Sequence, residues 1–493
     1  MMQSEFTQRA SHISAHGLGL SVDVYSPDLR HLVQSLRDEQ LSPGYLEIFK
    51  ATTSAMQWVR RQFPEIKLAY HGEGLWVTQP DFPQSCSGRQ GVAEACAQIA
   101  ALGSAWLNHE CATKQMAGYA FGTYLPPLYT ELSARVTGEN LVFLQDRLDE
   151  QARCHMAPPS LVLLEMPPLT YFACGSLAIP DFFRAVTDRA ACGLVLDIGH
   201  LWTVYRYTGA WRRQTLESFA THFLDDFPME RVVEIHVAGL ATYVESGLDT
   251  DTERVAFPYW IDAHGAPIPE VLFDLLAQVL AHPRLRFLKG MALEVDTKPV
   301  AVIVREFRRF LDRFESKIRY AEPIGHIDSS PSEGPDAFQR PLHDSALTSE
   351  KQATLHRQYE GYVELVTTPD RVPMTHELSL LGGSLDDLNR YREIYLPHEL
   401  LHWGGELKHM FPKTCDLLAA ANIPLERFVS LWFEMPRPEQ ENYDFFLLKI
   451  DRFIEFVESN CPFAGATVME EAEELRAAYR AANEPIMSAE VSA

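Results

Sequence analysis

Short apolar segments alternate with longer amphipathic segments over the first 314 residues of the chain. The apolar segments are rich in Val, Leu, Ile and Ala and have the length of buried strands, while the stretches between them carry apolar residues at helical spacing. Strands are expected near 17–25, 45–49, 66–71, 104–109, 160–166, 193–199, 231–238 and 287–296. Eight alternations of strand and helix within roughly 300 residues predict a parallel (β/α)8 TIM barrel of the α/β class.

The pattern changes after the predicted barrel. Residues 322–350 are rich in Pro, Ser, Gly and acidic residues and show no apolar period, which is typical of a linker. From 351 to 493 the apolar positions recur at helical spacing. We therefore expect a barrel domain over 1–321, a linker over 322–350 and a mainly α-helical accessory domain over 351–493.

Six of the expected strands end, or nearly end, on a histidine or an acidic residue. The runs read KLAYHG, AWLNHE, SLVLLEM, GLVLDIGH, VVEIHVAG and MALEVD. The C-terminal ends of all barrel strands open onto one face, where active sites lie. Nine imidazoles and carboxylates at this face exceed the needs of one tetrahedral zinc and suit two or three metal ions. The candidate ligands are His71, His109, Glu165, Asp197, His200, His236, Asp262, His264 and Glu294.

Two of the candidate pairs are close in sequence. Asp197 and His200 are three residues apart where the sixth strand gives way to a loop, and Gly199 between them permits a tight turn. Asp262 and His264 are two residues apart in the loop after the seventh strand, so in extended backbone their side chains share a face. Each pair is therefore expected to approach one metal together.

Each candidate also has an ordinary explanation as an isolated polar residue at the end of a strand. This explanation is less convincing for the nine candidates taken together, because all nine are expected at the same end of one barrel. Cys192 and Met166 are expected to be packing residues. Glu47 and Glu73 also lie near strand ends, where they could contact ligands or substrate, although such residues more often face solvent.

The composition of the chain makes several classes of function and location less expected. The formal net charge is −24 and the isoelectric point is near 5.2, which disfavours a nucleic-acid partner because that affinity needs a basic surface. The N-terminal residues are polar and no apolar run approaches the ~18 residues of a spanning helix, so we expect neither a secretory signal nor a membrane segment. The eight scattered cysteines form no CxxC pair and indicate reduced thiols in a cytoplasmic protein.

Several motifs together resemble one known family. The series HGEGLW, LNHE, LLEMP, GLVLDIGH, EIHVAG, IDAHGAPIP and LEVDTK, over residues 16–314, is similar to the multinuclear non-haem iron-dependent oxidases, the DUF692 family that includes the methanobactin oxidase subunit. The resemblance implies a TIM barrel that holds two or three irons in mixed Fe(II)/Fe(III) states on the same nine residues. Two motifs depart from the family: Glu165-Met166-Pro167 replaces Glu-Asn-Pro, and Asp197-Ile198-Gly199-His200 replaces Asp-x-Asn-Asn.

The same resemblance implies an activity. Family members use O2 to modify a cysteine or another residue of a ribosomally synthesised precursor peptide, and a separate partner protein usually presents the peptide. Residues 351–493 are a candidate for a fused equivalent of that partner. The tail can also be a plain interaction module, with Trp403, Trp432, Phe433 and Phe446 in its core.

Three other functions stay open at this point. The ligand order is similar to that of the trizinc endonuclease IV family of phosphodiesterases, although the acidic balance disfavours DNA. A sugar isomerase uses the same scaffold. In the tail, His398-Glu399-Leu400-Leu401-His402 matches the H-E-x-x-H pattern of zinc metalloproteases, but an ordinary amphipathic helix is the preferred interpretation.

Overall fold

The computed structural model describes residues 2–25, 28–116, 119–156, 158–242, 260–318, 348–367, 375–402, 405–432 and 445–483. These residues belong to two compact units. The first comprises Met1–Thr113 and Leu125–Leu388, and the second comprises Lys114–Tyr124 and Asn389–Ala493. The predicted linker, apart from residues 348–350, lies outside the described residues.

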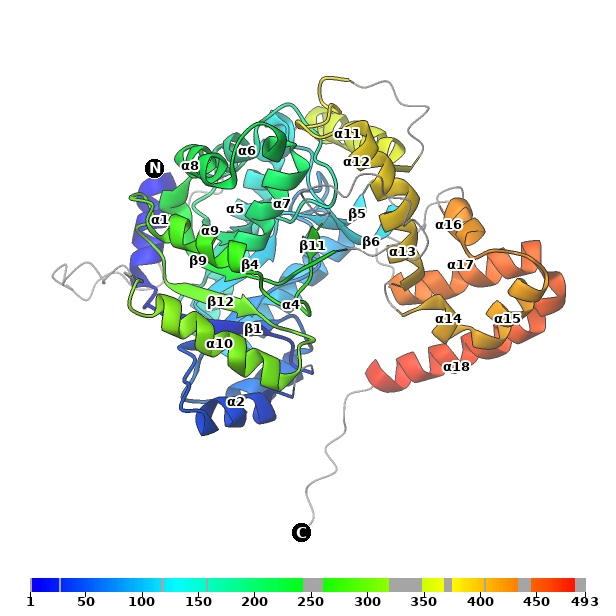
Figure 1. Cartoon of the computed structure of the whole chain (residues 1–493), viewed down its shortest axis with the longest axis horizontal. Helices are drawn as coiled ribbons and strands as arrows, with labels where there is room; N and C mark the ends of the chain where they lie inside the picture. Colours follow the sequence, from blue (N-terminus) through cyan, green and yellow to red (C-terminus); the bar gives the residue numbers. More distant parts are fainter. Residues whose placement is uncertain are drawn as a thin grey trace, which may run out of the picture. The chain divides into compact units, whose positions relative to one another are not determined.

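The first unit is a closed barrel of parallel strands, as the sequence predicts (Figure 1). Around the barrel the order is β1-β12-β9-β8-β7-β4-β3-β2, and each expected strand is present. The strands are β1 (Gly17–Val22), β2 (Tyr45–Phe49), β3 (Lys67–His71), β4 (Trp106–Glu110), β7 (Leu161–Glu165), β8 (Gly193–Asp197), β9 (Val232–Val237) and β12 (Gly290–Glu294). Most of their residues are buried, because helices cover the outside and side chains fill the inside.

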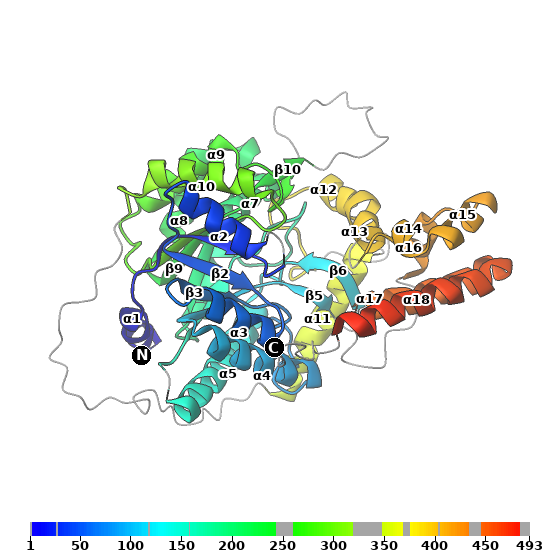
Figure 2. The ribbon, with the colours of Figure 1, turned by 90° about the horizontal axis from the view of Figure 1, so that it is seen from below.

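Helices surround the strands of this unit (Figures 1 and 2). Asp28 caps the second helix by accepting a hydrogen bond from the His31 amide at 2.9 Å. A short antiparallel pair, β10 (Leu240–Thr242) and β11 (Trp260–Asp262), follows β9. The helices are α1 (Met2–His12), α2 (Leu29–Asp38), α3 (Thr53–Gln62), α4 (Cys86–Leu102), α5 (Glu131–His155), α6 (Ile179–Thr187), α7 (Ile198–Tyr207), α8 (Leu216–Asp226), α9 (Glu270–Leu280), α10 (Val300–Phe314) and α11 (Ser349–Thr367).

The first helix, α1, contributes to the apolar core of the barrel. Phe6 and Ala10 pack in one cluster with Trp106, and none of the three is exposed. Arg9 on the same helix donates to both carboxylate oxygens of Asp149, at 2.9 and 2.6 Å. This bidentate pair is buried and fixes the helix to α5, so the N-terminal segment is an integral part of the fold.

Tyr45 occupies the barrel interior because two glycines leave room for its ring. A Cβ atom at Gly19 would lie 2.4 Å from the Tyr45 ring, and one at Gly290 would lie 2.8 Å from its hydroxyl oxygen. Both glycines are in strands that flank the ring, on β1 and β12. The Tyr45 hydroxyl donates to Glu234 on β9 at 2.5 Å, so a polar group is held deep inside the barrel.

The helix α11 differs from the sequence expectation, which assigned residues from 351 onward to an accessory domain. In the structure α11 is part of the first unit. The Tyr359 hydroxyl lies 3.1 Å from the Ser133 hydroxyl on α5, and the Tyr362 hydroxyl donates to the Pro126 carbonyl at 3.3 Å. An amphipathic pattern shows that a helix has a buried face but does not identify the surface that covers it.

The second unit is mainly helical, as expected, and also contains residues 114–124 of the hairpin formed by β5 (Thr113–Met116) and β6 (Tyr119–Leu125). Its core is aromatic: Phe428 contacts Trp432, Phe453 and Phe456. Trp403 and Phe433, two of the predicted core residues, lie outside the described residues. The helices are α12 (Leu385–Arg390), which spans the division between the units, η5 (Tyr391–Tyr395), α13 (Leu396–His402), α14 (Leu407–Met410), α15 (Pro412–Ala420), α16 (Glu426–Trp432), α17 (Phe445–Asn460), η6 (Pro462–Ala464) and α18 (Gly465–Asn483).

Within the described ranges, no helix is both long enough and apolar enough to cross a bilayer.

Candidate metal centre

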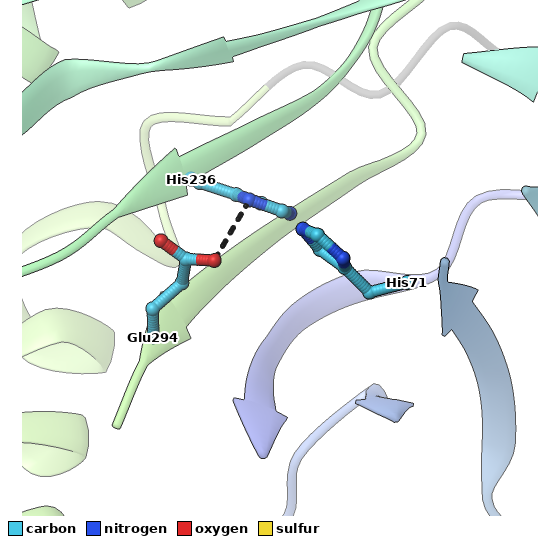
Figure 3. A group of neighbouring side chains, drawn as sticks. All are labelled: His71, His236 and Glu294. Carbon is cyan, nitrogen blue, oxygen red and sulfur yellow. Dashed lines mark ion pairs between the residues drawn. The ribbon is translucent and has the colours of Figure 1, made fainter. Parts of the chain in front are cut away.

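Eight of the nine predicted ligands come together at the C-terminal end of the barrel. Five of them are the last or nearly last residues of their strands: His71 on β3, Glu165 on β7, Asp197 on β8, His236 on β9 and Glu294 on β12. Ligand atoms of His71, His236 and Glu294 lie within 4.8 Å of one another, and Figure 3 shows these three side chains converging. The atoms of Glu165, Asp197 and His236 form a second such group, and those of Glu47, Glu234 and His236 form a third.

The remaining three members come from the segments that connect the barrel strands. His200 stands in the first turn of α7, directly after β8, where Asp197 caps the helix by accepting the His200 amide at 2.6 Å. The segment is therefore a strand-to-helix junction and not the loop expected from the sequence. Asp262 ends β11, and its Oδ2 lies 3.3 Å from His264 Nε2, so this pair approaches one site as predicted from its spacing.

Two clustered histidines are held through backbone carbonyls. His71 Nδ1 lies 3.1 Å from the Gly72 carbonyl oxygen, and its Nε2 faces Glu165 Oε2 at 3.4 Å. His200 Nδ1 lies 2.6 Å from the Met166 carbonyl oxygen, and its Nε2 faces Asp262 Oδ2 at 3.5 Å. A carbonyl oxygen can only accept, so Nδ1 must carry the proton in both rings and Nε2 is left for a metal.

The other two clustered histidines lie against carboxylates on both sides of the ring. His236 Nε2 lies 3.0 Å from Glu47 Oε2, and its Nδ1 faces Glu294 Oε1 at 3.3 Å. His264 Nδ1 lies 2.6 Å from Asp296 Oδ1, and its Nε2 faces Glu294 Oε2 at 3.3 Å. His71, His200 and His264 thus have one nitrogen hydrogen-bonded to an outer acceptor and the other directed at the shared carboxylates, which is how metal-binding histidines are oriented. Both nitrogens of His236 face carboxylates without an ordinary hydrogen bond.

Most ligand atoms in the cluster lack an ordinary hydrogen-bond partner. Buried polar atoms are normally paired, so a concentration of unpaired ones needs an explanation. Bound metal ions would supply the missing partners, and oxygen and imidazole nitrogen are donors that divalent transition metals accept. The unpaired atoms include Glu165 Oε1, Asp197 Oδ2, His200 Nε2, both ring nitrogens of His236, Asp262 Oδ1 and Glu294 Oε2, and beside them Glu47 Oε1 and Glu234 Oε2.

His109 is the predicted ligand that the structure arranges differently. Its Nδ1 lies 2.7 Å from the Glu110 carbonyl oxygen, which leaves Nε2 as the free acceptor. That nitrogen accepts a hydrogen bond from the Leu75 amide at 2.9 Å. Both ring nitrogens are therefore engaged, and His109 could bind a metal only after the Leu75 hydrogen bond is broken. Its role as a ligand stays a prediction.

Several acidic residues near the cluster were not among the predicted ligands. Glu234 is fully buried two residues before His236, and Asp296 follows Glu294 at the same interval. Glu110 ends β4 beside the cluster, where burial and the Glu165 charge raise the pKa of its carboxyl to about 7. Alternation along a strand could have identified Glu234 and Asp296, because residues two apart point the same way.

Electrostatics in the cluster reflect an excess of buried acid. Burial and the neighbouring Glu294 and Asp262 charges raise the pKa of Asp197 to about 7, and this outweighs the His200 imidazole, which lowers it. Burial and the adjacent Glu47 charge raise the pKa of Glu234 to about 7 as well. Without metal, the carboxylates are balanced only by protons on themselves and on the histidines.

The pKa values of the clustered histidines reflect the same excess of buried acid. Burial alone would lower the pKa of His71, yet its hydrogen bond to Glu165 and the charges of Glu47 and Glu165 raise that pKa to about 9. The pKa values of His200, His236 and His264 are also raised, because surrounding carboxylates outweigh burial. Each carboxylate–imidazolium contact marks a position where a metal ion can replace a proton.

The H-E-x-x-H segment of the tail has a different geometry. The rings of His398 and His402 stack with centroids 3.8 Å apart, and His402 Nδ1 lies 2.8 Å from the His398 carbonyl oxygen. Burial raises the pKa of Glu399 to about 7, and its charged neighbours are Lys114 and Lys449 rather than the two histidines. None of the three-ligand groups found among the described residues includes His398 or His402.

Comparison with known proteins gives distant relatives over the barrel. The chain is 27% identical over 269 residues to a UPF0276 protein of Caulobacter vibrioides strain NA1000, covering 54% of this chain and 82% of that protein. It is 24% identical over 313 residues to a UPF0276 protein of Anaeromyxobacter sp. strain Fw109-5, covering 62% and 93%.

Solved structures resemble the barrel only loosely. Endonuclease IV from Thermus thermophilus matches at 15% identity with a TM-score of 0.35, over 60% of this chain and 99% of that one. A xylose isomerase-like TIM barrel protein from Mycobacterium smegmatis in complex with magnesium matches at 13% identity with a TM-score of 0.37, over 62% and 100%. Values this low support no functional argument.

A family model gives the assignment. The model described as RiPP precursor modification enzyme MbnB/TglH/ChrH matches residues 30–310, which is more than half of the chain and nearly the whole barrel. The matched range contains every strand of the barrel except β1, as well as all nine predicted ligands. The chain therefore belongs to the MbnB/TglH/ChrH family of RiPP precursor modification enzymes.

Proposed function

We propose that this protein is a multinuclear iron-dependent oxidase that uses O2 to modify a cysteine or another residue of a ribosomally synthesised precursor peptide. One observation carries the proposal: eight ligand side chains converge on one end of the barrel, with four histidine nitrogens aimed at shared carboxylates. The family description supplies the class of substrate, a precursor peptide.

Charge supports the presence of more than one metal ion. Glu47, Glu165, Asp197, Glu234 and Glu294 are each at most 2% exposed, and Asp262 adds a further carboxylate. Burying a carboxylate without a counter-charge is unfavourable, and four imidazoles, even when all are protonated, supply only four positive charges against six carboxylates. Three divalent ions would match the six negative charges, two would leave a smaller excess, and in either case the imidazoles stay neutral.

The donor set fits iron. Imidazole nitrogens and carboxylate oxygens are ligands of non-haem iron, and the cluster contains no thiolate, which would favour zinc or an iron–sulfur centre. When bound, iron would supply the redox chemistry with O2. The chain itself orients the ligands. The Asn108 amide donates to Glu165 Oε2 at 2.7 Å, and outer acceptors fix the rings of His71, His200 and His264.

The second unit is proposed to hold the precursor peptide. Barrel closure needs none of its helices, because the strand order is complete within the first unit. A binding module in the same chain raises the local concentration of its peptide at the active site, so it can replace a separate partner protein.

Substitution of the ligands tests the metal assignment. We expect His236→Ala and Asp262→Ala to abolish peptide oxidation and to lower iron content, while the fold is retained, because residues at the barrel mouth contribute chemistry rather than core packing. Elemental analysis, activity and circular dichroism of the anaerobically reconstituted proteins measure the effect. Loss of folding with metal retained would contradict it, as would full activity with zinc alone.

The stability of the metal-free protein should depend on pH in a defined direction. The folded-state pKa of His71 is raised to about 9, so its contribution is complete below pH 6.5 and is lost as the pH rises through 9. The melting temperature of the metal-free protein should therefore fall between pH 7 and pH 9.5, and added Fe(II) should restore it. His71→Gln should flatten this fall; a melting temperature that rises over the range in the metal-free wild type would oppose the account.

The H-E-x-x-H segment should be dispensable for catalysis. His398→Ala and Glu399→Ala are expected to keep turnover within a few-fold of the wild type, since Glu399 lies near two lysines and not beside the histidine pair. Turnover and zinc content of the purified variants check this. A large loss of turnover in a folded variant, or zinc bound to the isolated segment, would support a second metal site or a protease.

The proposed role of the tail has a direct test. A small open reading frame beside the gene identifies the candidate peptide, and co-expression followed by mass spectrometry measures its modification. The full chain should oxidise the peptide faster than a variant that ends at Leu388, because the variant lacks the helices of the second unit. Equal rates and equal peptide affinity in the two proteins would show that the tail does not bind the substrate.

A further inference from the structure

One of the three groups of potential ligands reaches deeper into the barrel than the strand ends. It consists of Glu47 on β2 together with Glu234 and His236 on β9, and none of these side chains has any exposed surface. Glu234 comes two residues before His236, which places it about 6–7 Å further towards the N-terminal end of the barrel. Barrel interiors are normally filled by apolar side chains, so two acids and an imidazole at this depth need a physical explanation.

The His236 ring stands between two pairs of carboxylates. Its Nδ1 lies 3.3 Å from Glu165 Oε1 and 3.3 Å from Glu294 Oε1, and Figure 3 shows the contact with Glu294. Its Nε2 lies 3.0 Å from Glu47 Oε2 and 3.7 Å from Glu234 Oε1. Among the described residues, neither ring nitrogen has a hydrogen-bond partner. The deeper pair of acids therefore faces Nε2, and the pair at the strand ends faces Nδ1.

The separation of Nε2 from Glu47 suits two ligands of one ion. Two donor atoms that each bind an ion at about 2.1 Å lie about 3 Å from each other when they meet it at right angles. Such atoms point at the ion and not at each other, so their contact is short without being a hydrogen bond. The 3.0 Å contact between His236 Nε2 and Glu47 Oε2 has both properties.

A hydroxyl group holds each of the two deeper carboxylates by one oxygen. Ser21 donates to Glu47 Oε2 at 2.7 Å, and Tyr45 donates to Glu234 Oε1 at 2.5 Å. The second oxygen of each acid, Glu47 Oε1 or Glu234 Oε2, is buried and has no hydrogen-bond partner among the described residues. A hydroxyl orients a carboxylate but does not neutralise it, so the pair still requires a counter-charge.

A buried glutamate in the second unit shows how the chain satisfies such a group without a metal. Glu471 is 4% exposed, and its Oε1 accepts the Lys413 amide at 2.8 Å. Its Oε2 accepts the amide and the hydroxyl of Thr414, at 3.1 and 2.7 Å. Both oxygens of Glu471 are therefore paired, as is usual for buried polar atoms. Glu47 and Glu234 differ because each keeps an unpaired oxygen.

We propose that Glu47, Glu234 and His236 Nε2 hold a divalent transition metal ion inside the barrel, in addition to the ions at the strand ends. The inference deepens the proposed metal centre and rests on it, because His236 belongs to both. Carboxylates and imidazole are ligands that such ions accept, and one divalent ion matches the charge of the two acids. A neutral imidazole has one lone pair, so an ion on Nε2 leaves the ring proton on Nδ1 unless a second ion displaces it.

The position inside the barrel indicates a structural role for this ion. Its three ligands have no exposed surface, so a peptide substrate cannot reach it. The strands β2 and β9 do not pair with each other in the barrel. The inner ion would therefore link two strands across the interior, and it would fix the His236 ring at the base of the cluster where the chemistry takes place.

The number of bound ions tests the inference. Full-length protein is freed of metal, reconstituted anaerobically with Co(II) and desalted, and elemental analysis then gives the cobalt per chain. Glu47→Gln and Glu234→Gln keep the shape of the side chain and remove its charge, so each variant should bind one ion per chain fewer than the wild type. Glu471→Gln makes the same change at the fully paired carboxylate of the second unit and should bind as many ions as the wild type.

Crystallography locates the ion without any substitution. Anomalous scattering from cobalt in crystals of the reconstituted wild type should give one peak between Glu47, Glu234 and His236 Nε2, separate from the peaks at the strand ends. Circular dichroism and thermal melting identify any glutamine variant that does not fold. For such a variant the position of the anomalous peaks in the wild type decides.

The outcomes separate this inference from the proposed metal centre. If the wild type binds neither Co(II) nor Fe(II) at micromolar concentration, the metal centre itself is wrong. If cobalt binds only at the strand ends and both glutamine variants keep the wild-type count, the inner position is wrong and the metal centre stands. If folded glutamine variants lose every ion, Glu47 and Glu234 support the whole cluster, and a separate inner position is contradicted.

Discussion

The excess of buried carboxylate at the C-terminal end of the barrel is the constraint on which the site depends. Glu165, Asp197 and Glu294 end strands that are buried, and Glu47 and Glu234 lie in the same interior. Such a group of acids is tolerable only when cations or protons neutralise it. In the metal-free protein, the raised pKa values of Asp197 and Glu234 favour their protonated, neutral forms, which reduces the negative charge. In the active protein, bound metal ions would neutralise this charge instead.

The barrel makes this concentration of charge possible because its strand pairing is rigid. Asp197 pairs in register with His236, and Ser21 pairs with both Glu47 and Glu294. The ligands on the barrel strands are therefore fixed by the sheet, and the rings of His71, His200 and His264 are fixed again by outer acceptors. Preorganisation of this kind lets a protein bind several ions without a large conformational change.

Much of the barrel and most of the site could be predicted, because apolar runs ending in His, Asp or Glu mark both the strand and its C-terminal end. The hydrogen bond to His109 Nε2 could not be predicted. Its donor is the amide of Leu75, in a loop whose path the hydrophobic pattern does not show. The packing of α11 was also missed, because an amphipathic helix does not specify its partner. Asp296 was missed although it follows Glu294 at strand spacing.

The most direct measurement is the metal stoichiometry of anaerobically reconstituted protein, combined with Mössbauer spectroscopy of ⁵⁷Fe. The account predicts two or three high-spin irons per chain in a nitrogen and oxygen environment, magnetically coupled, and a loss of this coupled signal in the Glu294→Ala variant. A single isolated iron, or a full complement of zinc that supports oxidation of the precursor peptide, would contradict it.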